Sequence, residues 1–267
     1  KSCFLYLGIL PEDYYISGGR LIRLWIAEGF VKEQKGKTLE EVAEEYLTDL
    51  IHRSLVVSDR EAGTCRVHDL VREIILSKSE ELSFCQVLSE ANPIFDPQTR
   101  RLSIHTSMDN VLEITGNSHN RSVFLFRVNQ LPESSVGRLV SNFKLLKVLD
   151  LEDAPLDFLP EEVGNLFHLR YLSVKNSKIK IIPKSIGKLH NLQTLDMRQC
   201  AVSELPVEIN RLHKLRHLMT RYPNDETDYG FHCERGVKIQ KGIGHLQELQ
   251  TLCDVEARSA LSKNWKI

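Results

Sequence analysis

The chain has 267 residues, of which 42% are hydrophobic and 27% are charged, the balance of an ordinary globular protein. Its 35 basic residues nearly cancel its 36 acidic residues and leave a formal net charge of −1. This balance argues against a protein that binds nucleic acid by neutralising phosphates. The length suits one large domain or two smaller ones, and the hydrophobic content argues against long disordered segments.

The cysteines are scattered through apolar runs, and no pair has the spacing of a zinc site. They are Cys3, Cys65, Cys85, Cys200, Cys233 and Cys253. We expect free, buried thiols in a reducing compartment and no metal site. No apolar run is long enough to span a bilayer, and the chain opens without a Met or a signal peptide. We therefore expect a cytoplasmic piece of a longer protein, with the membrane periphery or the nucleus as other locations.

The first third of the chain predicts several helices. Residues 3–10 are apolar all round, as in a buried helix, and a second helix is predicted at 21–28. The third, at 38–51, has the clearest pattern. Thr38 and Glu41 have the spacing of a capping box, and apolar residues then recur at i, i+3 and i+4.

A hairpin and a last helix complete this region. Residues 55–57 and 65–67 favour strands and flank a polar loop. Asp69 is placed to cap a helix that runs from 70 to about 82. Helices followed by a two-stranded wing are typical of a winged-helix domain, which we place at residues 1–90.

Many winged helices bind DNA through a helix in the major groove, so a DNA-binding regulator is one alternative. The predicted second helix carries only Arg20 and Arg23 among apolar residues. The lysines Lys32, Lys35 and Lys37 lie in a loop. The absence of a basic helical face disfavours this alternative, and no nucleic-acid partner is expected.

The second half contains an internal repeat. Leu146, Leu169, Leu192 and Leu215 recur every 23 residues, and each opens an L-x-x-L unit. Proline and small residues recur in the same phase. A period of 23 falls in the range of leucine-rich repeats, in which each repeat places one short strand on the concave side of a horseshoe. We therefore predict leucine-rich repeats over residues 146–267.

The phase survives one interruption. Leu246 follows Leu212 by 34 residues, and 34 − 23 leaves 11 extra residues. They fall in a polar insertion near 222–236, which we expect to be a surface loop. The closing residues show no polar cap, so the array is expected to continue beyond Ile267.

Residues 91–145 are assigned as a linker and degenerate repeats that lead into the regular array. Pro93 and Pro97 mark the expected junction between the domains. Residues 101–105 and 122–126 look like the strands of these degenerate repeats. The predicted fold is thus α+β and multi-domain, with a winged-helix domain followed by an α/β solenoid.

Strand residues between the leucines are expected to form a continuous strip on the concave face. The polar and aromatic members of this candidate partner-binding strip are Asp150, Glu152, Asp153, Tyr171, Lys175, Asp196, Arg198, His217 and Arg221. The strip changes from acidic to basic along the stack. Two interpretations remain open at this point: a solvated charged face, or a docking strip for a complementary protein surface, including another domain of the same chain.

Several stretches resemble plant intracellular nucleotide-binding leucine-rich-repeat immune receptors of the coiled-coil class. Residues 3–14, with the sequence CFLYLGILPEDY, look like the opening of their winged-helix (ARC2) subdomain, and residues 21–31 are similar to the segment that follows. Val67-His68-Asp69 matches the family's Met-His-Asp motif with Val in place of Met. The 23-residue repeats then follow in the expected order.

The resemblance implies that the longer parent is a nucleotide-dependent switch of innate immunity. ADP would hold the parent closed, and exchange for ATP would permit oligomerisation and defence signalling with hypersensitive cell death. The family's motif histidine reaches the ADP phosphates, so the resemblance assigns nucleotide binding to His68, supported by Val67 and Asp69. An imidazole N–H at a helix start suits an anion. Without the resemblance, His68 reads as a polar residue that closes a hairpin.

The resemblance also implies the partners: a pathogen effector or a guarded host protein, and the nucleotide-binding domain of the same chain. The repeats would mediate autoinhibition. The 267 residues contain neither a G-x-x-x-x-G-K-[ST] phosphate loop nor a Walker-B run, so we expect them alone neither to bind ADP or ATP tightly nor to hydrolyse ATP. No catalytic constellation stands out, which disfavours an enzyme. A plain repeat scaffold without a nucleotide role is the second alternative.

Overall fold

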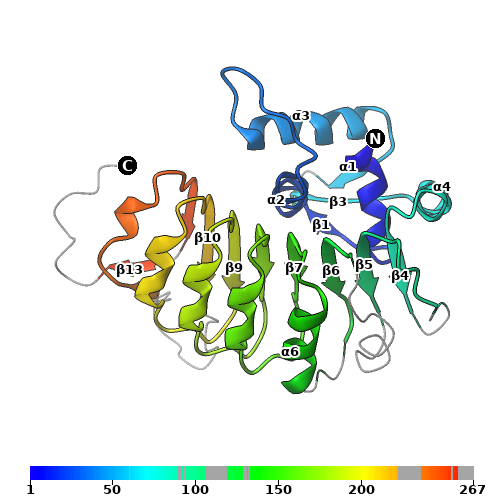
Figure 1. The fold of residues 1–267 in the computed structure, drawn as a ribbon. Helices are drawn as coiled ribbons and strands as arrows, with labels where there is room; N and C mark the ends of the chain where they lie inside the picture. The colour runs from blue at the N-terminus through cyan, green and yellow to red at the C-terminus, as the bar shows by residue number, and fades with distance from the viewer. Residues whose placement is uncertain are drawn as a thin grey trace, which may run out of the picture.

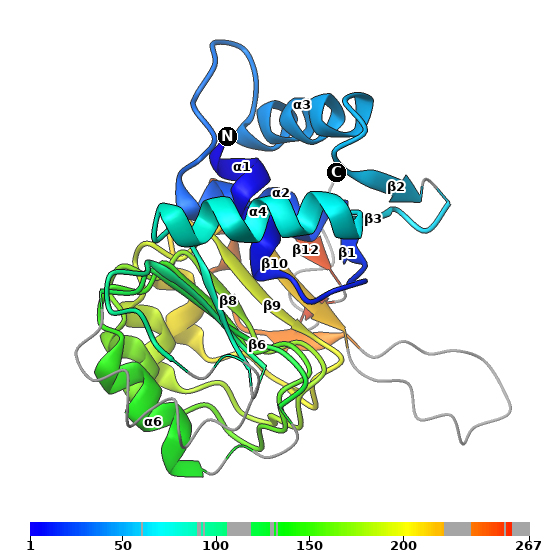
Figure 2. The ribbon, with the colours of Figure 1, turned by 90° about the vertical axis from the view of Figure 1, so that its right-hand side faces the viewer.

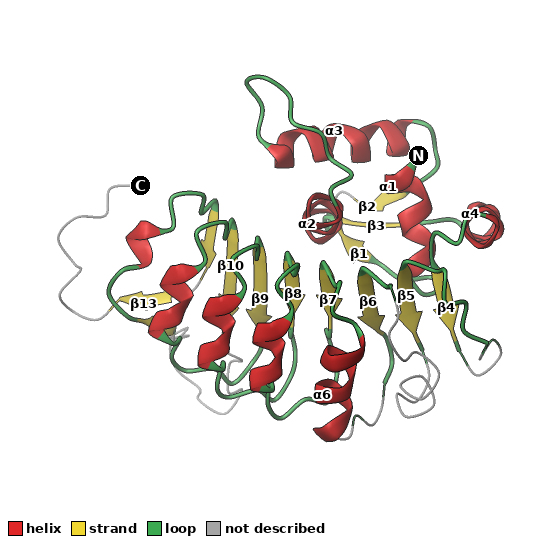
Figure 3. Ribbon diagram, viewed as in Figure 1, coloured by secondary structure: helices red, strands yellow, loops and turns green. Residues whose placement is uncertain are grey.

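The chain forms a helical unit that sits inside the concave face of a curved solenoid (Figure 1). The structure is a computed structural model, and the helices that follow each strand lie on the outer, convex side of the solenoid (Figure 3). It describes residues 1–59, 61–89, 92, 94–105, 119–128, 131, 133–221, 236–253 and 255–257.

The predicted helices of the first unit are confirmed. Its helical elements are α1 (Ser2–Leu5), the 3₁₀ helix η1 (Tyr6–Ile9), α2 (Gly18–Glu28), α3 (Leu39–His52) and α4 (Asp69–Glu81). The first predicted helix is thus half α and half 3₁₀. At Gly8 it presses on α4, because a Cβ there would lie 2.7 Å from Cγ2 of Ile75. Only glycine permits this close approach.

The starts of α3 and α4 differ in how they are capped. In α3 the predicted capping box is confirmed: the Glu41 amide donates to Thr38 Oγ1 at 3.2 Å, and the Thr38 amide donates to Glu41 Oε2 at 2.7 Å. In α4 the helix begins at Asp69, so the N-cap is His68, whose extended backbone suits that position. The prediction that Asp69 caps this helix is therefore wrong by one residue. The His68 side chain makes no capping hydrogen bond.

The predicted hairpin is confirmed and gains a third strand. β2 (Val57–Asp59) and β3 (Thr64–Arg66) pair antiparallel, and β1 (Ile16–Ser17) joins the other side of β3. A two-residue strand leaves no alternating pattern in the sequence, so β1 escaped prediction. The helices and this small sheet together form the predicted winged-helix domain.

The solenoid is built on one parallel sheet of eight strands. In spatial order the sheet runs β12 (Thr251–Cys253), β10 (His217–Arg221), β9 (Thr194–Arg198), β8 (Tyr171–Ser173), β7 (Val148–Asp150), β6 (Ser122–Leu125), β5 (Arg101–Ile104) and β4 (Gln86–Leu88). The register follows the repeat, since Leu149, Leu172, Leu195 and Leu218 face one another on neighbouring strands. All four are fully buried.

The domain boundary predicted at residue 90 is wrong. β4 already belongs to the solenoid sheet, with Gln86 opposite Leu102 of β5. The segment is short and partly polar, so its sequence gives no repeat signal. Pro97 consequently lies between two solenoid strands rather than between domains, and Pro93 lies outside the described residues. The predicted strands within 101–105 and 122–126 are confirmed as β5 and β6.

Short helices cover the convex side. They are α6 (Glu133–Asn142), η2 (Glu161–Asn165), η3 (Lys184–Lys188), η4 (Val207–Arg211) and η5 (Ile243–His245). Each of η2, η3 and η4 starts directly after one of the periodic prolines. A Cβ at Gly164 would lie 2.6 Å from the Ser185 main-chain oxygen, so this repeat position needs glycine wherever η helices stack so closely. The close stacking of successive η helices thus explains why glycine recurs at the same position of the repeat.

The end of the array is partly described. β11 (Val237–Ile239) and β13 (Val255–Ala257) form a separate parallel pair. The predicted insertion lies outside the described residues except for Gly236. Among the described cysteines, Cys3, Cys65, Cys85 and Cys200 are free and buried, and Cys253 is partly buried. Within the described ranges, no helix has the length and hydropathy needed to cross a membrane.

Candidate functional site

Part of the concave strip is covered by the winged-helix domain of the same chain. α2 contacts β7 and β8, and the helical domain lies on the concave side of the solenoid (Figures 1 and 2). Tyr171 is 0% exposed, and Asp150 and Asp196 are each 1% exposed. A solvated strip is therefore ruled out for these three residues, and the strip's nearest neighbour is another domain of this chain.

Apolar and aromatic side chains join the two domains into one core. Val148 and Tyr171 of the concave face pack in the same buried cluster as the residues of α1, η1 and α2. The Tyr6 ring lies edge-on to Phe124, with centroids 6.0 Å apart, and further rings stack around it. Such aromatic pairs add stabilisation beyond the area that they bury. The winged-helix domain and the first repeats consequently share one hydrophobic core.

The Arg20 cluster forms the centre of the charged contact. It consists of Arg20 of α2 with Asp150 and Glu152 of the repeats. Arg20 Nη2 lies 2.8 Å from Asp150 Oδ2, and Nη1 forms an ion pair with Glu152. Nη1 also donates to Tyr14 Oη at 2.7 Å. Burial raises the pKa of Asp150, and the neighbouring guanidinium offsets only part of that effect. Removing one partner would therefore leave a buried charge without compensation.

The Glu28 cluster lies toward the first strands of the solenoid. It consists of Glu28 at the end of α2 with Arg101 of β5 and Ser122 of β6. Arg101 donates through Nε and Nη2 to the two Glu28 oxygens at 3.0 and 2.9 Å, and the Ser122 hydroxyl donates to Glu28 Oε1. The guanidinium lies over Phe84 and Phe30, at 4.2 and 4.9 Å from the ring centroids. This bidentate, ring-stacked geometry is the strongest form of an Arg–carboxylate pair.

The Glu40 cluster lies at the other end of the contact. It consists of Glu40 in the first turn of α3 with Arg216 and His217 at the start of β10. Arg216 donates through Nε and Nη2 to the Glu40 oxygens at 2.9 and 2.6 Å. His217 Nε2 lies 3.0 Å from Glu40 Oε1, and its Nδ1 lies 3.1 Å from Thr251 Oγ1. Burial pushes the pKa of Glu40 up, but hydrogen bonds from His217 and Arg216 outweigh it and bring the pKa to about 2.

The remaining predicted strip residues pair within the solenoid. Lys175 Nζ lies 2.5 Å from Glu152 Oε1, and Arg198 forms two hydrogen bonds with Asp196 at 2.9 and 2.6 Å. Asp153 accepts from Asn176 one repeat further on, at 2.7 Å. Arg221 lies exposed at the end of β10. The strip therefore divides into a part covered by the winged-helix domain and a part nearer the strand ends that pairs with itself.

Sequence reasoning missed the winged-helix side of this contact. The sequence draws attention to Arg20 only as a candidate DNA-binding residue, and it does not single out Glu28 or Glu40. Charge complementarity is the signal that could have revealed the contact. The basic Arg20 faces the acidic repeats, and the acidic Glu40 faces the basic ones. Arg101 and Arg216 lie outside the regular strip, at the starts of β5 and β10, so the strip pattern could not include them.

The motif residues 67–69 lie away from the concave face, where β3 leads into α4. Val67 is 8% exposed and packs in the shared core, whereas His68 and Asp69 are exposed. The His68 carbonyl accepts the Arg72 amide at 2.9 Å, so the residue is fixed by its backbone while its imidazole is open to solvent. The His68 side chain makes no capping hydrogen bond to the first amides of α4, and the amides at a helix start suit an anion.

An apolar surface adjoins His68 on α4. Leu70 is 75% exposed and Ile74 is 59% exposed, one helical turn apart. Residues four apart on a helix lie on the same face. The motif histidine thus borders a small apolar surface.

The structure argues against the DNA-binding alternative, because Arg20, its main candidate residue, is buried. Arg20 is 5% exposed and engaged by two carboxylates, so its charge is not available to phosphates. The outer face of α3 carries Glu41, Glu44, Glu45 and Asp49, which would repel a nucleic acid.

Fold and site define a winged-helix domain docked on a leucine-rich-repeat solenoid. The family of the disease resistance protein winged helix domain matches residues 9–75, and that of the leucine-rich repeat region matches residues 119–265, more than half of the chain. Late blight resistance protein R1-A of Solanum demissum is 34% identical over 187 residues, covering 61% of this chain and 14% of that protein. An RPP13-like disease resistance protein of Arabidopsis thaliana is 37% identical over 183 residues, covering 63% of this chain and 21% of that protein.

The chain belongs to the leucine-rich-repeat family and is a portion of a plant nucleotide-binding leucine-rich-repeat disease resistance protein. It spans 14% and 21% of the length of these two relatives. Among solved structures, the ectodomain of the plant receptor kinase GASSHO1/SCHENGEN3 from Arabidopsis thaliana is similar with a TM-score of 0.44 and 21% identity. That match covers 60% of this chain and 19% of the other. The structure of PEPR1 with AtPEP1 is similar with a TM-score of 0.44 and 18% identity. That match covers 62% of this chain and 23% of the other.

Proposed function

We propose that this chain is the switch-and-sensor portion of a cytoplasmic plant immune receptor of the coiled-coil class. In this proposal the winged-helix domain responds to ADP or ATP bound by the parent, and the repeats restrain it. The observation that carries the proposal is the docking of the winged-helix domain in the concave face through the Arg20, Glu28 and Glu40 clusters. A contact of this kind couples the position of the repeats to the position of the winged helix.

His68 supports a nucleotide role because of where it lies. Its imidazole is exposed beside the uncapped start of α4, where an N–H donor and the helix amides both suit a phosphate oxygen. ADP would supply that anion when bound to the parent, and the His68 imidazole would help to hold it. Val67 anchors the turn in the core, and Asp69 begins the helix.

The exposed surface formed by Leu70 and Ile74 supports a second domain at this place. Solvent-exposed apolar side chains next to a functional residue are typical of a face that another domain covers. We propose the nucleotide-binding domain of the same parent as that partner. The winged-helix domain would then lie between this domain, on its α4 side, and the repeats, on its α2 side.

The repeats are proposed to recognise a pathogen effector or a guarded host protein and so to relieve autoinhibition. Because the concave strip is largely occupied by the winged-helix domain, such a partner would either compete with that domain or bind the remaining surface. The released parent would exchange ADP for ATP, oligomerise and signal in defence with hypersensitive cell death.

The test uses the longer parent protein. It is purified and denatured, and the released nucleotide is identified by chromatography for wild type, His68→Ala and the matched control His52→Ala, an exposed histidine at the end of α3. We expect ADP from wild type and His52→Ala and depletion in His68→Ala. No nucleotide in any sample would leave a repeat scaffold as the better function, and equal ADP in all three would remove His68 from the site.

A further inference from the structure

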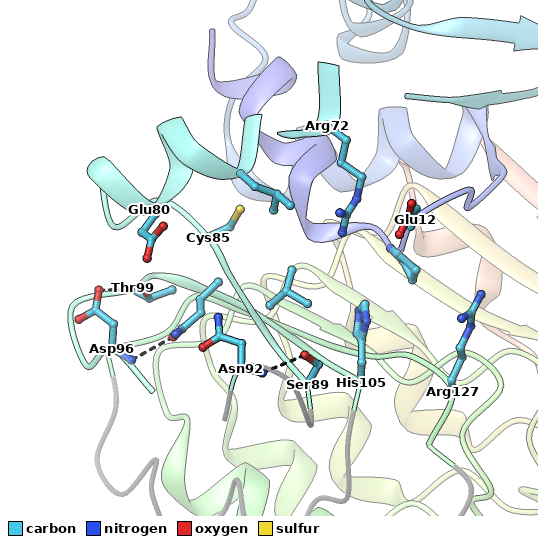
Figure 4. Close-up of a pocket in the computed structure, with 14 residues that line it drawn as sticks. Glu12, Arg72, Glu80, Cys85, Ser89, Asn92, Asp96, Thr99, His105 and Arg127 are labelled. Carbon is cyan, nitrogen blue, oxygen red and sulfur yellow. Dashed lines mark hydrogen bonds between the residues drawn. The ribbon is translucent and has the colours of Figure 1, made fainter. Parts of the chain in front are cut away.

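A cavity lies at the junction of the two domains, under α4. It has a volume of about 530 Å³ and lies between α4 and the turn after η1 on one side and β4 and the segments after β4, β5 and β6 on the other (Figure 4). Cavities of a few hundred cubic ångströms accept small molecules. Neither the proposed role of His68 nor the concave contact uses this cavity.

One end of the cavity is cationic. Arg72 comes from α4, His105 follows β5 and Arg127 follows β6, and Figure 4 shows the three along one side of the cavity. Arg72 donates to the Leu10 carbonyl through Nε and Nη2 at 3.4 and 3.2 Å. Within the described residues, no carboxylate lies within 4.0 Å of either guanidinium. These two charges therefore face the cavity without a direct counterion.

The two guanidiniums also act on His105, which lines the same end of the cavity. Burial lowers the pKa of His105, and the charges of Arg72 and Arg127 lower it further, to about 4. The exposed carboxylate of Glu12 also lines the cavity and is drawn between Arg72 and Arg127 in Figure 4, but the charges that lower the pKa of His105 are those of the two guanidiniums. At neutral pH the ring is uncharged, and its Nε2 pairs with the Ser103 hydroxyl at 2.9 Å.

The opposite end of the cavity offers acceptors and amides. Glu80 is exposed at the end of α4, and Asn92, Ser89 and Thr99 line the wall below it. Asp96 is already engaged, since its oxygens accept from the Gln98 amide at 2.9 Å and the Thr99 hydroxyl at 3.2 Å. The Glu80 carboxylate and the Asn92 side-chain amide at this end suit the hydroxyl groups of a ligand.

We propose that this junction cavity binds a small phosphate ester that carries hydroxyl groups, with its phosphate between Arg72 and Arg127 and its hydroxyls toward Glu80 and Asn92. Arginine pairs with phosphate through several hydrogen bonds at once. Because the lining comes from α4 and from the solenoid strands, a bound ligand would contact both domains and stabilise their junction. The inference is independent of nucleotide binding at His68.

The binding test uses isothermal titration calorimetry on the whole chain. The probes are glycerol 3-phosphate, inorganic phosphate and glycerol. We expect saturable binding of glycerol 3-phosphate, weaker binding of phosphate and none of glycerol. Absence of saturable binding by both phosphate probes would overturn the proposal.

The variants locate the site. Arg127→Gln changes an exposed side chain, so the fold is retained, and we expect its affinity for glycerol 3-phosphate to fall about tenfold or more. The matched control Arg138→Gln changes an exposed arginine on α6, on the convex side, and should leave the affinity unchanged. Equal affinity in Arg127→Gln and wild type, or an equal loss in both variants, would place the ligand elsewhere and contradict the proposal.

A second test of the proposal measures the pKa of the His105 imidazole. An anion between Arg72 and Arg127 would favour protonation of His105, so its pKa, followed by NMR, should rise from about 4 in the presence of glycerol 3-phosphate. Below about pH 5, where a phosphate ester with a second pKa of about 6 is already a monoanion, the affinity should rise by linkage as pH falls toward the pKa of His105. Glu12, Glu80, Asp96 and Cys85 also face the cavity, so His105→Gln serves to isolate the histidine contribution. An unchanged His105 pKa in saturated protein would contradict the proposed phosphate position.

Discussion

The two ends of the contact between the domains use the same chemistry in different surroundings. At one end, the side chains of Glu28 and Arg101 are 0% and 7% exposed. At the other, those of Glu40 and Arg216 are 21% and 13% exposed. Both pairs are bidentate, but water screens the second pair more than the first. We therefore expect the Glu28 pair, near the point where the chain passes from one domain to the other, to hold the domains together more firmly than the Glu40 pair at the far end of the solenoid.

The largest effect is expected from Glu28→Ala. The variant leaves the Arg101 guanidinium buried without its carboxylate, which costs about 3–5 kcal/mol of the free energy of unfolding. Urea denaturation followed by circular dichroism measures this loss. The matched control Glu33→Ala removes an exposed carboxylate in the loop before α3 and should change stability by less than about 0.5 kcal/mol. Similar stability in both variants would show that burial does not distinguish the Glu28 cluster.

A smaller effect is expected at the other end from Arg216→Gln. Here the remaining carboxylate of Glu40 still reaches water and His217, so the loss should be about 1–2 kcal/mol. The same denaturation experiment measures it, with the exposed Arg211→Gln on η4 as the control. A loss as large as that in Glu28→Ala would contradict the proposed difference between the two ends.

The contribution of Glu40 to the free energy of unfolding should also depend on pH. The pKa of Glu40 is about 2 in the folded protein, against an ordinary value of 4.5. The unfolded chain therefore binds more protons in this range, so the contribution of Glu40 is complete above about pH 4.5 and is lost as pH falls toward 2. The difference in unfolding free energy between wild type and Glu40→Gln should shrink from pH 6 to pH 3. A constant difference across this range would show that Glu40 is not paired as described.

The smallest effect on stability is expected on the face that contacts neither the repeats nor the core. Leu70→Ser and Ile74→Ser remove exposed apolar side chains, so each should change the free energy of unfolding by no more than about 0.5 kcal/mol. In the longer parent, however, the same variants should lower the ADP content if another domain covers this surface. Strong destabilisation of the 267-residue chain by either variant would place these side chains in its core instead.

The fold was largely predictable because its signals are local or periodic. The capping box at Thr38 lies within one turn, and the 23-residue phase of the leucines reflects the same packing repeated. β1 and β4 were missed because strands of two or three residues carry too little pattern. The start of α4 was placed one residue late because either His68 or Asp69 fits a cap in sequence, and only the backbone distinguishes them.

The concave contact was predictable only in part. The strip residues follow from the repeat, so Asp150 and His217 could be placed on one face from sequence alone. Their partners could not, because Arg20 and Asp150 are separated by 130 residues and Glu40 and His217 by 177. No local pattern encodes which distant charge completes a pair. The role of His68 rests on the resemblance of its motif and is a prediction that nucleotide analysis of the parent must test.

The central claim is that the winged-helix domain is held on the concave face by pairs that bridge the domains. A double-mutant cycle on Glu40 and Arg216, whose residues are 176 apart in sequence, tests it most directly. The unfolding free energies of wild type, Glu40→Gln, Arg216→Gln and the double variant give the coupling between the two side chains. The account predicts a coupling of about 1–2 kcal/mol that weakens at high salt. Additive effects with no coupling would mean that the two domains are not docked as described.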